Sequence, residues 1–265
     1  MDLERIDFSH SNGLARITFA NEANGNALDL RCCREFVLVA SEAVSDPSVK
    51  AVLIEARGKA FCVGGDLKEF LSHRERMHAH VLDLATQFHI AITRLRNGPA
   101  PLIIAVNGVA AGGGFSLVLN ADMAIAKRSA KLVAAYSRSG LSPDGGGSWF
   151  LPRLVGLQKA FDIFATNPTL TAEQALQLGI LSRVIDDADF DAEVEKLVQS
   201  ILTSPPGALA ALKKLLRASA SANFEQQLVA EADAIAQSVS LPSTIAKLDQ
   251  FMAERSGKRV TSGKQ

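Results

Sequence analysis

The most constraining stretch of this sequence is Pro101–Asn120, which reads PLIIAVNGVAAGGGFSLVLN and carries no charged residue. Its first half has the composition of a buried strand, and the apolar run breaks at Asn107-Gly108 before it resumes through three glycines, residues 112–114. Glycines have no Cβ, so a ligand oxygen can come close to the backbone N–H groups at the start of the next helix. This order of strand, glycine turn and buried helix predicts a site for negative charge, with tight helix packing as the alternative.

The residues around these glycines exclude the common phosphate-binding loops. A P-loop needs Lys-Ser or Lys-Thr directly after its glycines, and a dinucleotide fingerprint needs a further glycine at a fixed spacing. The segment GGGFSL, residues 112–117, satisfies neither pattern. The predicted site therefore suits an anionic oxygen of another kind, and a second glycine turn facing the same cleft would favour this hypothesis over packing alone.

Composition limits the class of protein. With 265 residues and 48% hydrophobic content, the chain can bury a full core in one large domain, or in one domain with an appendage. Lys and Arg together number 28, as do Asp and Glu, so the net charge is zero and no global field favours nucleic acid. The uncharged run 99–121 is long enough to cross a bilayer, but its prolines, Asn107 and glycines favour a buried strand and helix without a membrane partner.

The cysteines and histidines do not form a metal or disulfide pattern. Cys32, Cys33 and Cys62 are odd in number and two of them are adjacent, which favours free thiols in a reducing cytoplasm. His78 and His80, in HRERMHAH, stand two residues apart and so do not share a helix face. We expect this histidine segment to be a solvated surface.

Strand and helix patterns alternate along the chain up to about Val184, which predicts an α/β core, and helices follow. The core is expected over residues 1–204 and a helical C-terminal segment over residues 205–265. A Ser-Asn-Gly turn predicts a hairpin over residues 2–19, and TAEQ at 171–174 is a capping box. The other expected elements are a helix over 30–44 capped by Asp29 or Asn26, strands over 49–56, 121–126 and 131–136, a helix beginning at Leu67, and helices over 81–95, 190–202, 207–218 and 224–239.

Two further glycine turns stand next to an aspartate. In AFCVGGDL, Gly64-Gly65 ends a strand-to-helix connection, Asp66 is the expected helix cap, and the N–H groups around Val63 are expected to point into a cleft. In LSPDGGGSW, Asp144 comes directly before glycines 145–147. There it is either the N-cap of the helix through Trp149 or a group with a chemical role, and the residues alone leave both interpretations open.

Three motifs in this order resemble the enoyl-CoA hydratase/isomerase, or crotonase, superfamily. They are AFCVGGDL at 60–67, VNGVAAGGG at 106–114 and LSPDGGGSWFLPRLVG at 141–156, and the resemblance extends to NGNAL at 24–28, LTAEQALQLGILSRV at 170–184 and FMAERSGK at 251–258. It spans nearly the whole chain. The resemblance implies a crotonase-like spiral of ββα units with a helical C-terminal segment, assembled as a homotrimer or a dimer of trimers.

The resemblance also implies a site for an acyl-CoA thioester. The backbone N–H groups of Val63 and Gly113 would form an oxyanion hole that stabilises a thioester enolate. No separate cofactor is expected, because the substrate itself carries coenzyme A. The positions implied for binding coenzyme A are Asn26, Ala27, Leu28, Ala60, Cys62, Gly64, Asp66 and Leu67, together with Arg255 and Lys258 reaching a neighbouring subunit's nucleotide.

The reaction class follows from which carboxylates the chain has. Hydratases of this superfamily carry two glutamates that activate water, and these positions fall on Ser116 and Tyr136, neither of which is a carboxylate base near neutral pH. Asp144 in its PDGGG setting resembles the superfamily's isomerases of 3-enoyl-CoA and of epoxyphenylacetyl-CoA. One carboxylate is enough to remove a proton from C2 of the thioester, which gives the enolate, and to return the proton at C4. An isomerase is therefore the expected activity, and Asp144 is the expected base.

Three alternatives remain beside an isomerase: an enoyl-CoA hydratase, a hydrolase resembling 4-chlorobenzoyl-CoA dehalogenases, and a noncatalytic acyl-CoA-binding member. The dehalogenases have an aspartate nucleophile where this chain has Asp144 and a histidine at the position of His89. However, the tryptophan that assists them falls on Tyr136. Besides these residues, the substrate pocket is expected to include Ser116 and Leu141, and both straight-chain and aromatic acyl groups remain open.

Overall fold

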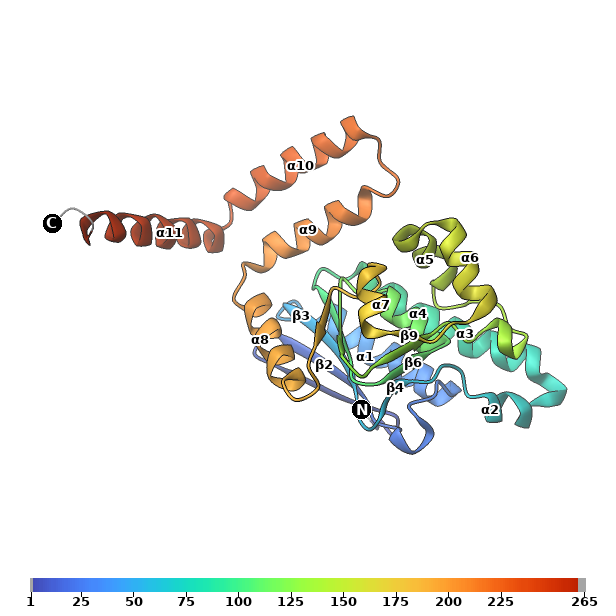
Figure 1. The fold of residues 1–265 in the computed structure, drawn as a ribbon. Coiled ribbons are helices and arrows are strands. Elements are labelled where there is room, and N and C mark those ends of the chain that lie inside the picture. Colours follow the sequence, from blue (N-terminus) through green and yellow to red (C-terminus); the bar gives the residue numbers. More distant parts are fainter. Residues whose placement is uncertain (1, 262–265) are drawn as a thin grey trace. The chain divides into compact units, whose positions relative to one another are not determined.

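The structure, a computed structural model, describes residues 2–261, and the side chains of residues 206 and 256–261 lie outside that description. The chain divides between Leu202 and Thr203 into two compact units. The first unit contains two β-sheets and the helices that cover them (Figure 1). The three glycine turns and Asp144 all lie in this first unit, so it holds every residue of the predicted oxyanion site.

A six-stranded sheet runs through the first unit in the order β1-β2-β3-β5-β7-β10. The predicted hairpin is confirmed, since β1 and β2 pair antiparallel around the Asn12-Gly13 turn, and all the other pairs in this sheet are parallel. The strand bounds are β1 Ile6–Ser11, β2 Leu14–Phe19, β3 Ala51–Ala56, β5 Leu102–Val106, β7 Met123–Lys127 and β10 Arg183–Ile185.

A second, four-stranded sheet has the order β4-β6-β8-β9, with strands β4 Ala60–Cys62, β6 Val109–Ala111, β8 Lys131–Val133 and β9 Leu170–Thr171. Successive strands alternate between the two sheets, since β3 is followed by β4, β5 by β6 and β7 by β8. A helix comes after each of these pairs. This repeated strand–strand–helix unit is the architecture that the family resemblance implies.

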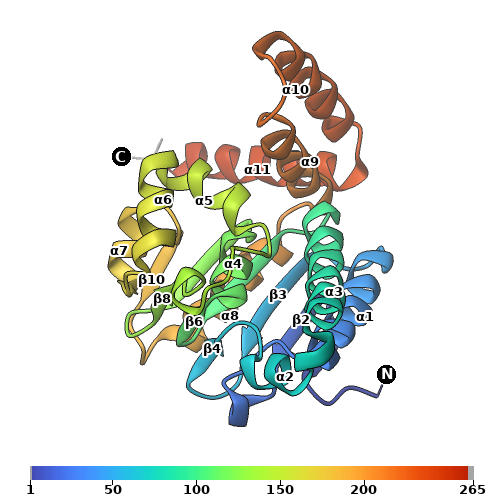
Figure 2. The ribbon, with the colours of Figure 1, turned by 90° about the vertical axis from the view of Figure 1, so that its right-hand side faces the viewer.

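Three helices of the first unit, α1, α2 and α7, begin at the predicted capping residues. Asp29, and not Asn26, caps α1 by accepting a hydrogen bond from the N–H of Cys32 (2.6 Å), and α1 packs against α3 (Figure 2). The predicted capping box of α7 is also confirmed. The helices are α1 Leu30–Ser45, α2 Leu67–Ser72, α3 Met77–Asn97, α4 Gly113–Leu119, α5 Gly147–Val155, α6 Leu157–Thr166, α7 Ala172–Gln177 and α8 Phe190–Leu202.

The second unit consists of α9 Pro206–Ala218, α10 Phe224–Val239 and α11 Pro242–Thr261. Its last helix, α11, includes the segment FMAERSGK at residues 251–258. Asn223 caps α10 through a capping box, as its side chain and that of Gln226 each accept a backbone N–H. The bounds of α10 match the predicted range 224–239, because both of its ends carry clear sequence signals.

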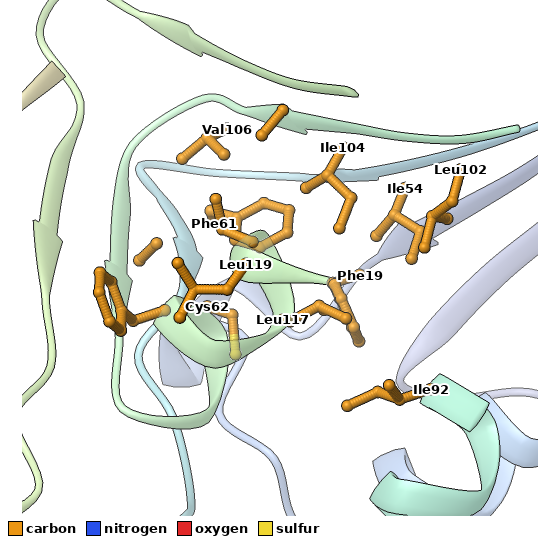
Figure 3. Packing of buried hydrophobic residues seen from close by; sticks show 14 of the residues in the cluster. Phe19, Ile54, Phe61, Cys62, Ile92, Leu102, Ile104, Val106, Leu117 and Leu119 are labelled. Carbon is orange, nitrogen blue, oxygen red and sulfur yellow. The ribbon is translucent and has the colours of Figure 1, made fainter. Parts of the chain in front are cut away.

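The uncharged stretch Pro101–Asn120 is the centre of the core. Strand β5 is buried on both faces: Leu102, Ile104 and Val106 belong to one apolar cluster, and Ile103 and Ala105 to a second, which includes residues of α8. Helix α4 is buried along its whole length. Figure 3 shows Leu117 and Leu119 of α4 beside Phe61 and Cys62 of β4. Within residues 2–261, no helix is long and apolar enough to span a membrane.

Candidate functional site

Two glycine turns come into contact at one end of α4. Gly64 has a φ of 91°, and a Cβ placed on it would lie 2.8 Å from the carbonyl oxygen of Ala111 and 3.1 Å from the backbone nitrogen of Gly113. Any other residue would clash there, so glycine is what allows the approach. Gly113 is the first residue of α4, so its N–H has no partner within the helix.

The glycine triplet serves both purposes that the sequence leaves open. A Cβ on Gly114 would lie 2.2 Å from the carbonyl oxygen of Cys62, which shows that this glycine lets α4 pack directly on β4. A Cβ on Gly113 would meet Leu28 at 2.8 Å and would stand 3.9 Å from Oδ1 of Asp144. Gly114 is therefore a packing glycine, whereas Gly113 lies beside a carboxylate.

The expected donor role of Val63 does not fit its hydrogen bonding. The Val63 N–H donates to the carbonyl oxygen of Gly25 at 3.1 Å, so it is already used within the protein. The turn at Gly64 explains this direction, because its positive φ reverses the chain between residues 63 and 65. Sequence can show that a turn exists here, but it does not show toward which side each amide points.

Gly65 is the residue of this turn that sequence reasoning missed. It forms an isolated parallel bridge with Leu28, in which the Leu28 N–H donates to Gly64 O (2.8 Å) and Leu28 O accepts from the Asp66 N–H (3.1 Å). In such a bridge, the N–H of Gly65 itself points away from Leu28. Throughout the described residues, no hydrogen bond of that amide is found.

Asp144 is not the cap of the helix that follows it. Helix α5 begins at Gly147, its N-cap is Gly146, and no side chain makes a capping hydrogen bond. The carboxylate of Asp144 instead accepts a hydrogen bond at Oδ1 from the hydroxyl of Tyr136, at 2.6 Å. Since the same oxygen lies near Gly113, Asp144 and the two glycine turns gather at one place.

Ser116 and Tyr136 lie behind Asp144 as a pair of buried hydroxyl groups. Their oxygens are 2.7 Å apart, and the two residues are 0% and 6% exposed. Burial, reinforced by the negative charge of Asp144, raises the pKa of Tyr136 far above its ordinary value. The phenol therefore keeps its proton at neutral pH, and neither residue supplies a second carboxylate at the site.

His89 and Asn120 hold the backbone of Gly145, next to Asp144. Nε2 of His89 accepts a hydrogen bond from the Gly145 N–H (2.9 Å), which requires a neutral ring with its proton on Nδ1. Nδ2 of Asn120 donates to the carbonyl oxygens of Gly145 (2.7 Å) and Ser116 (2.8 Å). Sequence reasoning missed Asn120, although a buried asparagine at the end of an apolar helix was a signal for such a role.

The positions predicted to bind coenzyme A divide into buried and exposed groups. Asn26 is 1% exposed, and its Nδ2 donates to the carbonyl oxygens of Arg57 and Ala60, both at 2.9 Å. The side chains of Ala27, Leu28 and Cys62 are buried as well. These side chains therefore support the loops from behind, and the prediction that these positions bind coenzyme A then depends on their backbone atoms.

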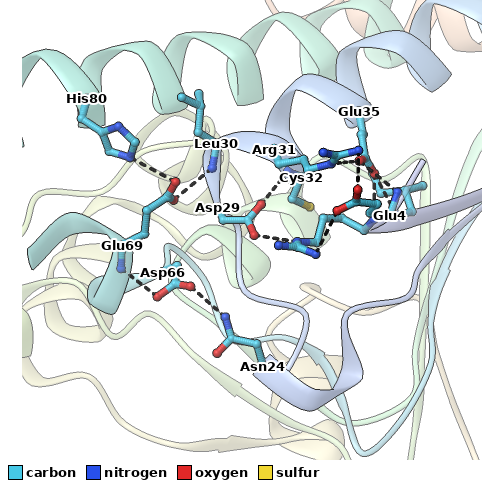
Figure 4. A network of polar contacts seen from close by, with 12 residues as sticks. Glu4, Asn24, Asp29, Leu30, Arg31, Cys32, Glu35, Asp66, Glu69 and His80 are labelled. Atoms are coloured by element: carbon cyan, nitrogen blue, oxygen red, sulfur yellow. Dashed lines mark hydrogen bonds and ion pairs between the residues drawn. The ribbon is translucent and has the colours of Figure 1, made fainter. Parts of the chain in front are cut away.

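Two less buried members of this group, the half-buried Asp66 and the exposed Leu67, lie at the start of α2. Asp66 caps α2 by accepting from the N–H groups of Lys68 (2.9 Å) and Glu69 (3.2 Å), as predicted, and it also accepts from Nδ2 of Asn24 (2.8 Å) (Figure 4). Leu67 is exposed and carries no polar contact to the core. Leu141, whose N–H donates to the carbonyl oxygen of Tyr136 (3.0 Å), is exposed too.

In the second unit, the guanidinium of Arg255 lies 5.6 Å from the ring centre of Phe251. Lys258 belongs to α11, but its side chain lies outside the described part of the chain. The roles of Arg255 and Lys258 in binding coenzyme A therefore stay predictions.

The histidine segment is not all solvated surface, and the expectation fails for His80. Its side chain is only 9% exposed, its ring stacks on that of His73 at 3.9 Å, and its Nε2 lies 3.3 Å from Oε1 of Glu69 (Figure 4). Glu69 also accepts from the N–H of Leu30 (3.0 Å), so the pair joins α2 to α1. The described residues hold no group of three or more potential metal ligands.

The cysteines are poor candidates for nucleophiles. Burial raises the pKa of Cys62 to about 12, and it raises the pKa values of Cys32 and Cys33 well above their ordinary value. A thiol must lose its proton to attack, so these thiols are unreactive near neutral pH. Asp144 is then the carboxylate that lies at the meeting point of the glycine turns.

Comparison with known proteins finds relatives of this chain in both sequence and fold. The family model described as enoyl-CoA hydratase/isomerase matches residues 9–256. The 1,2-epoxyphenylacetyl-CoA isomerase of Escherichia coli is 35% identical over 190 residues, covering 71% of this chain and 72% of the relative. The 4-chlorobenzoyl coenzyme A dehalogenase-2 of an Arthrobacter species is 28% identical over 94% of this chain and 91% of its own. The crystal structure of an enoyl-CoA hydratase from Polaromonas sp. JS666 superimposes with a TM-score of 0.88 at 29% identity, covering 94% of this chain and 97% of that one.

Proposed function

Because the chain belongs to the enoyl-CoA hydratase/isomerase family, we propose that it is an acyl-CoA isomerase in which Asp144 is the single acid–base group. The substrate is a 3-enoyl-CoA, or an epoxyphenylacetyl-CoA of the kind named in the E. coli relative. The observation that carries the proposal is the placement of Asp144 Oδ1 beside Gly113, where the turn at Gly64 also arrives.

The thioester carbonyl accepts hydrogen bonds from two backbone N–H groups in this proposal. One is the amide of Gly113, as predicted, and the other is the amide of Gly65, which replaces Val63 because the Val63 amide is bonded to Gly25. Fixed donors of this kind stabilise the negative oxygen of an enolate by roughly 3 kcal/mol each. They also lower the free energy needed to remove a proton from C2.

Asp144 carries the proton. Its carboxylate takes a proton from C2, which leaves the enolate on the oxyanion site, and returns the proton at C4 to give the conjugated 2-enoyl thioester. The neighbouring hydroxyls of Ser116 and Tyr136 support isomerisation over hydration, because neither is a second carboxylate able to activate water. One base is sufficient for the isomerisation.

A dehalogenase activity is the second candidate, and the Arthrobacter relative favours it. In that hypothesis, Asp144 attacks the aromatic carbon that carries the halogen, the halide leaves, and water activated by His89 hydrolyses the ester that forms. The contact of His89 argues against it, since Nε2 already accepts the Gly145 N–H at 2.9 Å. Asp144 is required in both reactions, so the substrate separates them.

The remaining expectations belong to the same proposal. Coenzyme A arrives with the substrate and lies along residues 24–28 and 60–67, with Arg255 and Lys258 of a neighbouring subunit near its nucleotide. The protein forms a homotrimer or a dimer of trimers in the cytoplasm, without a nucleic-acid or membrane partner. Free thiols and the zero net charge support this setting.

The test is turnover of 3-hexenoyl-CoA and 2-hexenoyl-CoA, following formation of the conjugated thioester separately from its hydration. We expect wild type to isomerise without hydrating and Asp144→Asn to lose the reaction while still binding acyl-CoA. Asp162→Asn is the matched control, because Asp162 is an exposed carboxylate of α6 that pairs with Lys159. Hydration by wild type, or turnover of 4-chlorobenzoyl-CoA alone, would replace the isomerase proposal by the corresponding alternative, and full activity of Asp144→Asn would remove Asp144 as the base.

A further inference from the structure

Three side chains form a continuous line of hydrogen bonds that ends at the proposed base. The oxygens of Ser116 and Tyr136 are 2.7 Å apart, and the Tyr136 hydroxyl donates to Oδ1 of Asp144 at 2.6 Å. They come from three segments of the chain: α4, the segment after β8 and the loop before α5. Nothing in the oxyanion site itself requires this line.

The chemistry of the three groups fixes the direction of the line. A phenol has one proton, and Tyr136 gives it to Asp144, so the contact with Ser116 must run from the serine hydroxyl to the tyrosine oxygen. Each donor in such a line strengthens the next, because a hydroxyl that accepts a hydrogen bond becomes a better donor. Burial raises the pKa of Tyr136, so this proton stays on the phenol over the physiological range.

The glycines after Asp144 make room for this arrangement. A Cβ on Gly147 would lie 2.5 Å from Oγ of Ser116, and one on Gly145 would lie 3.0 Å from Cβ of Ser116. The glycine cluster thus allows the turn to close over the serine. The ring of Phe164 packs at 6.2 Å from that of Tyr136 and helps to hold the phenol in place.

We propose that Tyr136 is a positioning residue for Asp144, and that Ser116 acts only through Tyr136. A carboxylate rotates easily about its last bond, since that torsion is broad and two-fold. The phenol removes this freedom by holding Oδ1, which leaves Oδ2 to exchange the proton with substrate. This role rests on the proposed function, because it is Asp144 acting as the base that gives the held carboxylate its purpose.

The kinetic test uses 3-hexenoyl-CoA with Tyr136→Phe, Ser116→Ala and the double variant. We expect Tyr136→Phe to lower kcat by about 10- to 100-fold with little change in KM, because a misplaced base costs rate while leaving substrate binding intact. Ser116→Ala alone should lower kcat by several-fold, and the double variant should be no slower than Tyr136→Phe, since residues acting in series are not additive. Ser182→Ala is the matched control, because its hydroxyl bonds the carbonyl oxygen of Ala124 (2.8 Å) and lies outside the line.

A second measurement is independent of turnover. Tyr136 is the only tyrosine in the sequence, so phenolate absorbance on alkaline titration, or the fluorine signal of incorporated fluorotyrosine, reports this residue alone. In folded Asp144→Asn the pKa of Tyr136 should fall relative to wild type, because a neighbouring negative charge has been removed while burial remains. Circular dichroism and acyl-CoA binding check that each variant is folded.

The outcomes separate this inference from the proposed function. An unchanged tyrosine titration in Asp144→Asn, an unchanged kcat in Tyr136→Phe, or kcat losses that multiply in the double variant would overturn the positioning role. Full isomerase activity of Asp144→Asn would instead overturn the proposed function. Loss of activity in Asp144→Asn together with an unimpaired Tyr136→Phe would leave the isomerase in place and remove only the inference.

Discussion

Asp66 and Asp144 each stand beside a glycine turn that leads into a helix, yet their side chains do different things. Asp66 follows its two glycines and caps α2 through the N–H groups of Lys68 and Glu69. Asp144 precedes its three glycines, so the helix start has moved on to Gly147, and its carboxylate is left to Tyr136 and the meeting point of the glycine turns. The side of the turn on which the aspartate stands decides whether it caps or remains available for chemistry.

Replacement by asparagine gives the largest predicted contrast between the two residues. An asparagine caps a helix about as well as an aspartate, but its amide cannot take up a proton as a base. Asp144→Asn should lower kcat for 3-hexenoyl-CoA by about 1000-fold with a nearly unchanged melting temperature. Asp66→Asn should leave both quantities near wild type, and a comparable loss of kcat in the two variants would refute the distinction.

The turn of Gly64 should tolerate substitution far less than an open glycine of similar conformation. Gly64→Ala places a Cβ 2.8 Å from Ala111 O at positive φ, so we expect a loss of roughly 2–3 kcal/mol of unfolding free energy and a large fall in kcat. Gly179→Ala is the matched control, because Gly179 also has positive φ (74°) but meets nothing within 4 Å. It should lose only about 1 kcal/mol, and equal losses in urea denaturation would mean that the contact with Ala111 is unimportant.

The stability of the folded protein at alkaline pH should depend on Tyr136, which bonds Asp144 and has no counterpart beside Asp66. The pKa of Tyr136 is raised in the folded protein, so the unfolded chain loses this proton at a lower pH than the folded protein does. The free energy of unfolding should therefore fall as the pH rises above about 10, by about 1.4 kcal/mol per pH unit. Tyr136→Phe should reduce this slope, measured by urea denaturation at several pH values. Asp66→Asn should not change it, and the same slope in all three proteins would contradict the assignment.

Removal of the cap gives the smallest predicted effect. Asp66→Ala leaves the first N–H groups of α2 without their carboxylate and should cost about 1 kcal/mol of unfolding free energy. Because Asp66 also accepts from Asn24, the loop over residues 24–28 should become more open to hydrogen exchange. A loss confined to kcat, with no change in stability, would mean that Asp66 shares the role assigned to Asp144.

The sequence predicted the elements whose signals are local. The β1–β2 hairpin, the caps Asp29 and Asp66, and helix α10 follow from turn and capping residues that act within a few positions. The buried strand β5 and helix α4 follow from an uncharged run too interrupted to span a membrane. Family resemblance added the spiral of strand pairs, which no local pattern contains.

What sequence could not predict depends on direction in space. The reversal at Gly64 turns the Val63 amide toward Gly25 and leaves that of Gly65, and no pattern of residue types encodes this orientation. His80 was expected in solvent, because its ring stack with His73 forms only once α2 has folded back on α3. Asn120 was passed over because its partners, Gly145 and Ser116, are joined to it only by the fold.

The tethering of Gly145 through His89 and Asn120 bears on the stereochemistry of the proposed reaction. A carboxylate on a turn held at both its N–H and its carbonyl oxygen approaches the bound acyl chain from one side only. The hydrogen that leaves C2 and the one that arrives at C4 should then share the same face of the enolate. A deuterium placed at C2 should therefore be recovered in part at C4, to the extent that the half-buried acid shields it from exchange with solvent.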